Sequence, residues 1–394
     1  MFVIENVLNT DCNLCCYFCF AKDKKDSNLT PASKFRHILD NIDKITNEKF
    51  VQVKYYGGEV MIHQDELIRH FETFVDFKRS YTGDKEFEFV IITNGTIYPN
   101  EKLLNLIKRI NCSISVSLEI NEEFHNKIRH YTNGSGSFDN VMNNIIRFNS
   151  DLGYRIGIQT VLSKECIDHM DLYLDFIDRY KKYCSFVFIP MFGCNEIDAD
   201  MLDKLPNAMK LYRDRMKYYF ENEDRCPISI FQEMRSLLKY YGMHFANNLE
   251  QQKHCLAGEE QITLMGDKMY PCSRFFHNDM KFLSYVDIDD FVTSKDKWRQ
   301  QISLDDECMW CQKTNDIGCI GRCLSAVYSN NNTNIPEVCK YNIIIGEHAK
   351  SMFSELKFNE KFIKALSSMI GSSTNHQMSD KFIIDIIDNL KTIL

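Results

Sequence analysis

Short β-like runs alternate with segments of helical periodicity between Met1 and about Cys194. Apolar residues recur at every second position in FVQVKYY and FEFVIIT, and SISVSL, IGIQTVL and CSFVFIP are similar runs. Helical patterns such as DELIRHFETFVDF and FDNVMNNIIRF lie between them. Strands that alternate with helices favour right-handed crossovers and a parallel sheet. Six such units predict an α/β fold, a partial (β/α)6 barrel of the TIM type.

The first β/α unit has clear boundaries in the sequence. The apolar run Phe2–Leu8 predicts a strand, and PASKFRHILDNIDKI predicts a helix with Thr30 as N-cap and Pro31 at its first position. In barrels of this type the chemistry lies at the C-terminal ends of the strands. The segments that follow each predicted strand are therefore where functional side chains are expected.

Three cysteines follow the first predicted strand: Cys12, Cys16 and Cys19, with the spacing C-x3-C-x2-C. Three thiolates on one short loop suit an iron–sulfur cube and leave one iron open to a non-protein group. A zinc knuckle is the alternative, but zinc needs a fourth protein ligand, and the flanking segments offer no Cys or His apart from the surplus Cys15. We interpret Cys15 as a packed or bystander thiol, with a shifted C-x2-C pairing as a minor alternative. The chain has sixteen cysteines and no signal peptide, so metal binding is a better first interpretation than disulfides.

The ends of the next three strands also carry polar or glycine-rich motifs. Gly57, Gly58 and Glu59 follow the second strand, and Asn94 follows the third, in ITNGT. Ser117 ends the fourth strand, in SVSLE, and the segment HNKIRHYTNGSGSF comes next. Taken alone, the Gly-Gly-Glu and the Asn could be plain turns, and Arg129 in that segment could be a solvated helix residue.

Taken together, these motifs resemble the radical S-adenosylmethionine (SAM) superfamily. The resemblance implies a [4Fe-4S] cluster on Cys12, Cys16 and Cys19 that binds SAM and, once reduced, cleaves it to a 5′-deoxyadenosyl radical. It implies that the Gly-Gly-Glu holds the SAM amino group and that a Ser and an Arg contact its carboxylate. The matching cofactor-binding residues are Phe18, Gly57, Gly58, Glu59, Asn94, Ser117 and Arg129.

A second set of seven cysteines lies between positions 255 and 339, and its centre reads C-x2-C-x7-C-x3-C. A zinc ribbon is the alternative, but seven thiols are too many for one tetrahedral site. The arrangement resembles the SPASM region of radical SAM enzymes, which holds two auxiliary [4Fe-4S] clusters. By that resemblance, the outer cluster is held by Cys308, Cys311, Cys319 and Cys339, and the inner cluster by Cys255, Cys272 and Cys323.

The chain departs from the pattern of these families at several places. The spacing between Cys311 and Cys319 is x7 instead of x5, and Asp267 stands where a Gly is usual. No fourth Cys follows Cys255 closely, so the inner cluster has an open iron or takes Cys226, Glu259 or another group. Glu119 and Ile120 replace the usual Asp-Gly after the fourth strand.

Four regions are expected: a radical SAM partial barrel (1–200), a helical bridge (201–253), a SPASM auxiliary-cluster domain (254–345) and a helical tail (346–394). The remaining thiols are assigned to the core, where free Cys is common. Cys194 is the exception, because it follows the sixth strand on the expected catalytic face.

SPASM enzymes most often modify peptides or proteins, and the resemblance therefore implies a crosslink or oxidative modification in a ribosomally synthesised peptide. Sulfatase-maturating enzymes, which form formylglycine, carry a catalytic Asp directly after the YPC cysteine, where this chain has Ser273. A Ser is no equivalent base, which counts against that reaction, and the sequence identifies no other general base. Two further alternatives are oxidation or isomerisation of a small metabolite and a zinc-stapled binding protein without catalytic activity.

The resemblance implies a peptide or small protein substrate and an external one-electron reductant of the flavodoxin or ferredoxin type. Since the first strand begins at Phe2, leader recognition is expected from the barrel rim, the tail or a separate leader-peptide-binding protein. The net charge of −8 provides no basic footprint for nucleic acid, and no apolar run is long enough to span a membrane. A cytoplasmic protein is expected.

Overall fold

The computed structural model describes residues 1–17, 19, 29–189, 197–229, 257–258, 260–275, 285, 287–294 and 336–373. The chain divides into two units, Met1–Gln159 with Leu256–Gln301 and Thr160–Cys255 with Ile302–Leu394. The four regions expected from the sequence stay predictions.

The first unit alternates strands and helices along the chain. Its elements are β1 (Phe2–Val7), α1 (Ala32–Asp40), α2 (Ile42–Ile45), β2 (Phe50–Tyr56), the 3-10 helix η1 (Val60–His63), α3 (Gln64–Ser80), β3 (Glu86–Thr93), α4 (Glu101–Arg109), β4 (Ser113–Ser117), α5 (Glu122–Ile128), α6 (Phe138–Leu152), β7 (Gln261–Met265), β8 (Lys268–Tyr270) and α11 (Ile288–Thr293). The strand β5 (Ile156–Val161) runs across the boundary between the units. The second unit contains α7 (Lys164–Asp168), α8 (Met170–Tyr180), β6 (Cys184–Ile189), α9 (Ala199–Asn222), α15 (Pro336–Leu356) and α16 (Glu360–Ser373).

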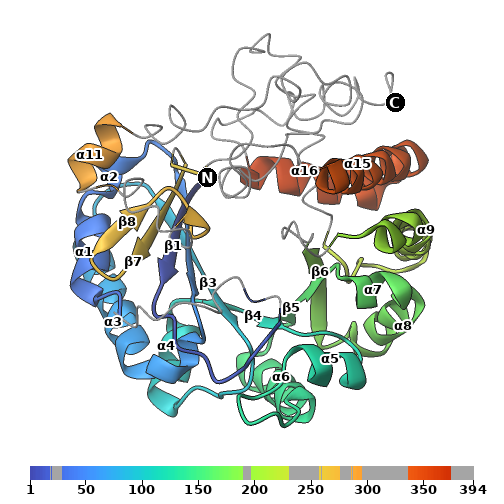
Figure 1. Cartoon of the computed structure of the whole chain (residues 1–394). Helices are drawn as coiled ribbons and strands as arrows, with labels where there is room; N and C mark the ends of the chain where they lie inside the picture. Colours follow the sequence, from blue (N-terminus) through green and yellow to red (C-terminus); the bar gives the residue numbers. More distant parts are fainter. Residues whose placement is uncertain are drawn as a thin grey trace. The chain divides into compact units, whose positions relative to one another are not determined.

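The strands form one eight-stranded sheet in the order β6-β5-β4-β3-β2-β1-β7-β8. The pairs from β1 to β5 are parallel, β7 is parallel to β1, and β8 is antiparallel to β7. The six strands expected from the sequence are therefore present, in an α/β fold of the expected class. Figure 1 shows α1, α3 and α4 on one side of the strands β1 and β3.

Two strands were not expected. β7 and β8 extend the sheet beyond β1, in a segment that the sequence analysis treated only as a cysteine motif. A two-residue turn, Gly266 and Asp267, joins them, and Gly266 has a φ of 57°. Gly-Asp between two apolar runs is a recognised hairpin pattern. The sequence pattern alone did not indicate this hairpin, because each of its two apolar runs is short.

The helix α1 begins one residue later than expected. Pro31 is its N-cap and makes no side-chain cap hydrogen bond, while the Ala32 amide donates to Glu66 Oε1 of α3 at 2.9 Å. Thr30 is buried and does not cap the helix. Its hydroxyl donates to the Val7 carbonyl at 2.6 Å and accepts from the Gly266 amide at 2.9 Å, so its side chain connects β1 to the β7–β8 turn.

An aromatic cluster forms the core between the strands and helices of the first unit. Tyr55 of β2 lies 6.1 Å from Phe35 of α1 and 5.3 Å from Phe71 of α3, measured between ring centroids. Phe89 of β3 lies 6.0 Å from Phe71. All four side chains are fully buried, so the helices are fixed against this face of the sheet mainly by the hydrophobic effect.

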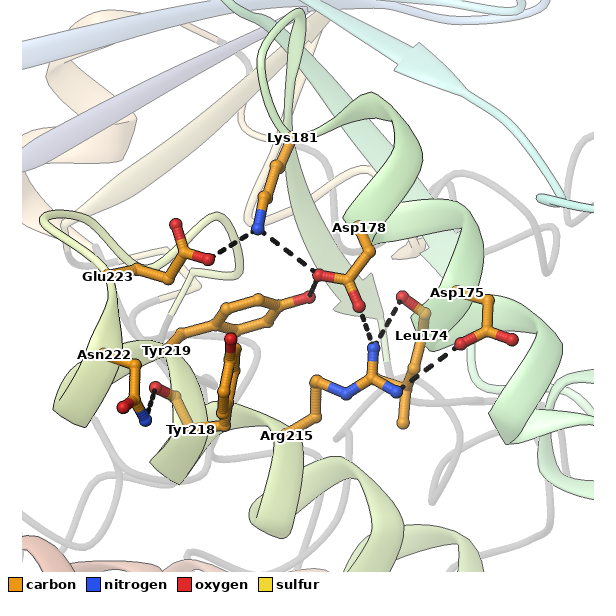
Figure 2. Close-up of polar contacts among 9 residues, drawn as sticks. All are labelled: Leu174, Asp175, Asp178, Lys181, Arg215, Tyr218, Tyr219, Asn222 and Glu223. Atoms are coloured by element: carbon orange, nitrogen blue, oxygen red, sulfur yellow. Dashed lines mark hydrogen bonds and ion pairs between the residues drawn. The ribbon is translucent and has the colours of Figure 1, made fainter.

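A polar network joins α8 to α9 in the second unit (Figure 2). Asp178 of α8 forms an ion pair with Arg215 and accepts a hydrogen bond from the Tyr219 hydroxyl at 2.9 Å. Lys181 donates to Glu223, just after α9, at 2.6 Å. These side chains are partly exposed, so the network orients the two helices and contributes little net stability.

None of the helices in the described part of the chain is long and apolar enough to cross a membrane.

Candidate functional site

The loop that carries the first cysteines continues the pairing of β1 with β2. The Leu8 amide donates to the Tyr56 carbonyl at 3.0 Å. Beyond the strands, the Gly58 amide donates to the Asn9 carbonyl at 3.0 Å, and the Glu59 amide donates to the Asp11 carbonyl at 2.6 Å. The Gly-Gly-Glu segment is thus held against the backbone that leads directly into Cys12.

Both glycines of this segment are required by close backbone approach. A Cβ atom at Gly57 would lie 2.1 Å from the Asn9 carbonyl oxygen, and one at Gly58 would lie 2.0 Å from the Asp11 carbonyl oxygen. Any side chain would therefore displace the cysteine loop, because backbone atoms do not approach a Cβ so closely. The two glycines thus let the Gly-Gly-Glu segment approach the chain's own loop closely.

The other side of the loop pairs with the segment after α5. Leu14 forms an antiparallel bridge with Tyr131, the Cys15 amide donates to the His130 carbonyl at 2.8 Å, and the Thr132 amide donates to the Asn13 carbonyl at 3.2 Å. The short loop is therefore fixed by backbone hydrogen bonds on both sides, which is the kind of support that a precise ligand geometry requires.

Cys12 and Cys16 are half-buried and act on each other electrostatically. Cys12 Sγ accepts from the Leu14 amide at 3.4 Å and from Asn94 Nδ2 at 3.7 Å. Burial raises the pKa of Cys12 to about 11, and burial also raises the pKa of Cys16, against the opposing charge of Arg129. Both thiols are consequently protonated at neutral pH unless a cation binds them, since a coordinated metal favours the thiolate.

Three thiols on one short loop are the kind of donors that an iron–sulfur cluster uses. The Cys19 amide donates to the Cys16 carbonyl at 3.2 Å, which keeps the second and third cysteines on one tight turn. Among the described residues, no group of three or more His, Cys, Asp and Glu side chains is arranged to hold one metal ion. A [4Fe-4S] cube takes each thiolate on a different iron, so its ligands need not converge on one point.

Glu59 is fully buried and joins the end of β2 to the end of β3. Its carboxylate accepts from the Met61 amide at 2.9 Å, the Thr93 hydroxyl at 2.7 Å and the Asn94 amide at 2.6 Å. Burial raises the pKa of Glu59, and these three donors act in the opposite direction. The carboxylate offers about four acceptor positions, so three protein donors still leave room for an ammonium group.

Asn94 connects the cysteine loop to β3. Its Nδ2 donates to Asn13 Oδ1 at 2.8 Å, and its Oδ1 accepts from the Thr96 hydroxyl at 2.7 Å. Asn13 in turn donates to the Thr96 hydroxyl at 2.8 Å. The polar side chain expected at the end of the third strand therefore lies beside the cysteines, within a closed set of three side chains.

Arg129 is buried and pairs with the buried carboxylate of Glu119, at 3.0 Å from Nη2 and 3.2 Å from Nε. Burial lowers the pKa of Arg129, but Glu119 and the thiol of Cys16 outweigh burial and leave this pKa raised. Glu119 therefore places a carboxylate directly on the guanidinium that lies beside the cysteine loop.

His125 fixes the position of this ion pair. Its Nδ1 accepts from the Glu119 amide at 3.2 Å, and its Nε2 lies 2.9 Å from the hydroxyl of Ser137, which donates to the Arg129 carbonyl at 2.5 Å. Burial, followed by the charge of Arg129, lowers the pKa of His125 to about 3. The imidazole is therefore neutral and acts as a structural hydrogen-bond bridge.

The sequence analysis missed the supporting residues of the site. Asn13 lies between two of the cysteines, and Thr93 and Thr96 flank Asn94, whereas His125 and Ser137 belong to HNKIRHYTNGSGSF. They could have been found from these motifs, because Asn, Thr, Ser and His next to a predicted ligand are the usual partners of buried polar groups.

Ser117, Cys272 and Cys339 are the remaining predicted site residues that the structure describes. Ser117 is half-buried at the C-terminal end of β4, paired in register with Gln159. Cys272 is half-buried after β8, and Cys339 is half-buried in α15. Phe18, Cys194, Cys255, Glu259, Cys308, Cys311, Cys319 and Cys323 lie outside the described residues.

Comparison with known sequences identifies relatives of the first half of the chain. The sequence model of the radical SAM superfamily matches residues 6–205. The chain is 27% identical over 209 residues to a cysteine-type anaerobic sulfatase-maturating enzyme of Clostridium novyi (strain NT), an alignment that covers 51% of this chain and 53% of the relative. An S-adenosylmethionine-dependent nucleotide dehydratase of Selenomonas ruminantium is 33% identical over 93 residues, 24% of this chain and 30% of the relative. The chain thus spans about half the length of the first relative and 30% of the length of the second.

Solved structures share the fold over more of the chain. Native anSMEcpe with bound AdoMet superimposes with a TM-score of 0.68 at 16% identity, over 88% of this chain and 96% of that chain. Streptococcus suis SuiB bound to the precursor peptide SuiA superimposes with a TM-score of 0.60, also at 16% identity, over 85% of this chain and 74% of that chain. At such low identity the likeness shows a common fold.

Proposed function

Because the chain belongs to the radical SAM superfamily, we propose that it is a radical enzyme that modifies a peptide or protein substrate. The observation that carries the proposal is the cysteine loop held between the Gly-Gly-Glu segment and residues 130–132, with Asn94 and Arg129 beside its thiols. Relatives support the peptide substrate: one is a sulfatase-maturating enzyme, and SuiB and anSMEcpe have been solved with bound peptides.

The superfamily implies SAM and a [4Fe-4S] cluster, and the residues present fit both groups. When bound, they supply a 5′-deoxyadenosyl radical that removes a hydrogen atom from the substrate. The thiolates of Cys12, Cys16 and Cys19 would hold the cluster. The Glu59 carboxylate would receive the SAM ammonium group, for which it retains an acceptor position.

Arg129 and Ser117 would bind the SAM carboxylate. The guanidinium of Arg129 is held in place by Glu119, and its planar set of donors can bind a second carboxylate as well. Glu119 neutralises part of the charge of Arg129, so this chain would bind the SAM carboxylate less strongly than it would without the pair. Phe18 is assigned to the same site by the resemblance alone.

Two auxiliary clusters are part of the proposal, with the cysteines named from the sequence as their ligands. Cys272 and Cys339 are the members within the described residues. Cys226, one candidate for the missing fourth ligand, packs against Met216 Sδ at 3.5 Å and the Ile228 carbonyl at 3.3 Å, and burial raises its pKa to about 12. This packing favours a core role for Cys226, so the fourth position of the inner cluster would be open or would be taken by Glu259 or another group.

The preferred reaction is a crosslink or oxidative modification in a ribosomally synthesised peptide. Formylglycine formation remains a second candidate because of the similarity to sulfatase-maturating enzymes, but Ser273 occupies the place of their catalytic Asp. The flavodoxin- or ferredoxin-type reductant, the leader-binding protein and the cytoplasmic location stay predictions. A third candidate is radical chemistry on a small metabolite. Transfer of a hydrogen atom from a peptide would favour the two peptide reactions over it.

The deciding experiment is anaerobic iron and sulfide analysis of the wild type and of a variant with Cys12→Ala, Cys16→Ala and Cys19→Ala. We expect about twelve irons to fall to about eight, with loss of SAM cleavage on reduction, because only the cluster that binds SAM is removed. Cys15→Ala is the matched control: this thiol is exposed in the same loop, and its loss should change neither value. Bound zinc without sulfide would instead support a zinc-stapled binding protein.

A further inference from the structure

The helix α4 has one face in the core and one face in contact with solvent. Leu103 and Ile107 are fully buried, and the Asn100 side chain accepts from the Leu103 amide at 2.9 Å, which fixes the start of the helix. Three polar residues on the opposite face are exposed: Glu101, Asn105 and Arg109. Within the part of the chain that the structure describes, none of the three side chains has a hydrogen bond or an ion pair.

A groove with a volume of about 450 Å³ lies along this face of α4, beside α3. An ion pair of 2.8 Å between Lys102 and Glu72 of α3 forms part of its lining. The other lining residues are Glu101, Asn105, Leu106 and Arg109. The lining thus carries two carboxylates and two cationic groups. A partner with a strong charge of one sign would be repelled by half of these groups, so the groove fits a partner that carries both signs.

Glu101, Asn105 and Arg109 form one ridge of the helix, because they are four residues apart in the sequence. We call these three residues the α4 ridge. Asn105 lies at its middle, and the acidic and the cationic residue lie about 6 Å along the helix axis on either side of it. A two-fold rotation about an axis beside Asn105 exchanges the two ends of the ridge. Opposite charges therefore stand at positions that the rotation brings together, as in the self-complementary surface of a symmetric dimer.

We propose that the α4 ridge is a dimerisation surface, and that its partner is the α4 ridge of a second copy of this chain running in the opposite direction. Glu101 of each copy forms an ion pair with Arg109 of the partner subunit. The two Asn105 carboxamides face each other at the two-fold axis, where each supplies a donor and an acceptor.

The lining of the groove agrees with this packing of helix on helix. Ridges of residues four apart pack side by side, each in a groove of the other helix, when the two axes are inclined by about 50°. Lys102 and Leu106 belong to the next ridge of α4, so the groove lies where a second ridge would enter. The inference does not depend on the proposed function, since it concerns only the surface of α4.

The first test is sedimentation equilibrium of the full-length, cluster-loaded protein under anaerobic conditions. One pair of helices buries a small interface, so we expect a weak dimer that forms as the concentration rises from about 1 to 100 μM. The dimer should weaken between about 0.1 M and 1 M salt, because its ion pairs are near the surface. A monomer at every concentration in low salt would overturn the inference and leave the groove to a different partner.

The second test reverses the charges of the α4 ridge. Glu101→Arg and Arg109→Glu should each raise the dissociation constant about tenfold or more, because by symmetry one substitution turns both attractive pairs into repulsive ones. The control is Lys210→Glu, at an exposed lysine of α9 outside the groove, which should leave the dissociation constant unchanged. An unchanged dissociation constant in either ridge variant would show that any dimer uses another surface.

Mixing the two ridge variants distinguishes lost pairing from damage to the fold. In an equal mixture one copy carries two cationic ends and the other two acidic ends, so dimers of one copy of each should form as tightly as the wild type. A chain with both substitutions, E101R and R109E, restores both pairs and should also dimerise. Melting temperatures identify any variant that fails to fold. No recovery in the mixture of folded variants, or in the double variant, would contradict the antiparallel pairing and overturn the inference.

Discussion

At the scale of single residues, the candidate site depends on the absence of side chains as much as on their presence. Gly57 and Gly58 let the Gly-Gly-Glu segment hydrogen-bond to the backbone of Asn9 and Asp11. Glu59 then reaches Thr93 and the Asn94 amide, and Asn94 reaches Cys12. These five polar contacts, from Asn9 to Cys12, thus depend on two positions at which no Cβ atom fits.

Gly58→Ala should destabilise the protein by about 2–3 kcal/mol, because the new Cβ overlaps a backbone oxygen that cannot move without the cysteine loop. The displaced loop should also incorporate fewer irons, by about four. Thermal unfolding and iron analysis after reconstitution measure the two effects.

Gly134→Ala is the control for this substitution. Gly134 has a φ of 85° and a Cβ there would meet no atom within 4 Å, so the change should cost only about 1 kcal/mol of backbone strain and no iron. Equal losses in the two variants would contradict a steric role for Gly58.

At the scale of elements, the sheet is extended by a hairpin that one buried side chain connects to β1. The Thr30 hydroxyl is hydrogen-bonded to both the Val7 carbonyl and the Gly266 amide. The contact joins β1 to the β7–β8 turn. Thr263 of β7 and Ser273, after β8, both donate hydrogen bonds to Glu5 of β1. The long separation in sequence explains why Thr30 was interpreted as a local helix cap: its real partners are defined only by the tertiary fold.

Thr30→Val keeps the shape of the side chain but leaves the Gly266 amide and the Val7 carbonyl without this hydroxyl. We expect a loss of about 2–4 kcal/mol in the free energy of unfolding, since buried unsatisfied groups cost about 1–3 kcal/mol each. Chemical denaturation measures the loss. Ser80→Ala removes the hydroxyl of an exposed residue at the end of α3, which donates to the Phe77 carbonyl at 3.1 Å, and should change stability by less than about 0.5 kcal/mol. A similarly small effect at Thr30 would show that the hairpin does not need this contact.

At the scale of the whole molecule, buried neutral histidines should make the fold sensitive to acid. Burial lowers the pKa of His70 to about 4 and those of His125 and His348 to about 3. His70 Nε2 donates to the Thr30 carbonyl at 2.8 Å, and Nδ1 lies 3.2 Å from Asn6 Nδ2. The neutral imidazole satisfies both contacts, and protonation of Nδ1 would remove the second.

The free energy of unfolding should therefore fall as the pH is lowered from about 6.5, the usual histidine pKa in an unfolded chain, to about 4. Over this range the unfolded state binds a proton that folded His70 does not, so His70 contributes a slope of up to about 1.4 kcal/mol per pH unit. His70→Gln should flatten the profile by that slope, while His125 and His348 keep a residual dependence. Urea unfolding at several pH values measures it, and an unchanged slope in His70→Gln would contradict the assignment.

Local patterns in the sequence determined much of this protein. An apolar run predicted β1, and alternating hydrophobicity predicted β2 to β6, because a half-buried strand repeats every two residues. The spacing of Cys12, Cys16 and Cys19 and the Gly-Gly-Glu segment predicted where the site lies, because the ends of parallel strands meet at one edge of a sheet. The superfamily found by comparison is the one that these motifs resemble, and the site residues themselves stay predictions.

Contacts between segments far apart in the chain were decided only by the tertiary structure. The pairing of β7 with β1 and the Thr30 contact with Gly266 each join residues whose identity is compatible with many partners. A hydroxyl or carboxylate fits a turn, a cap or a buried network equally well as a local pattern. Its partner is selected by which backbone groups remain without hydrogen bonds when the strands and helices pack, and that selection is a property of the fold.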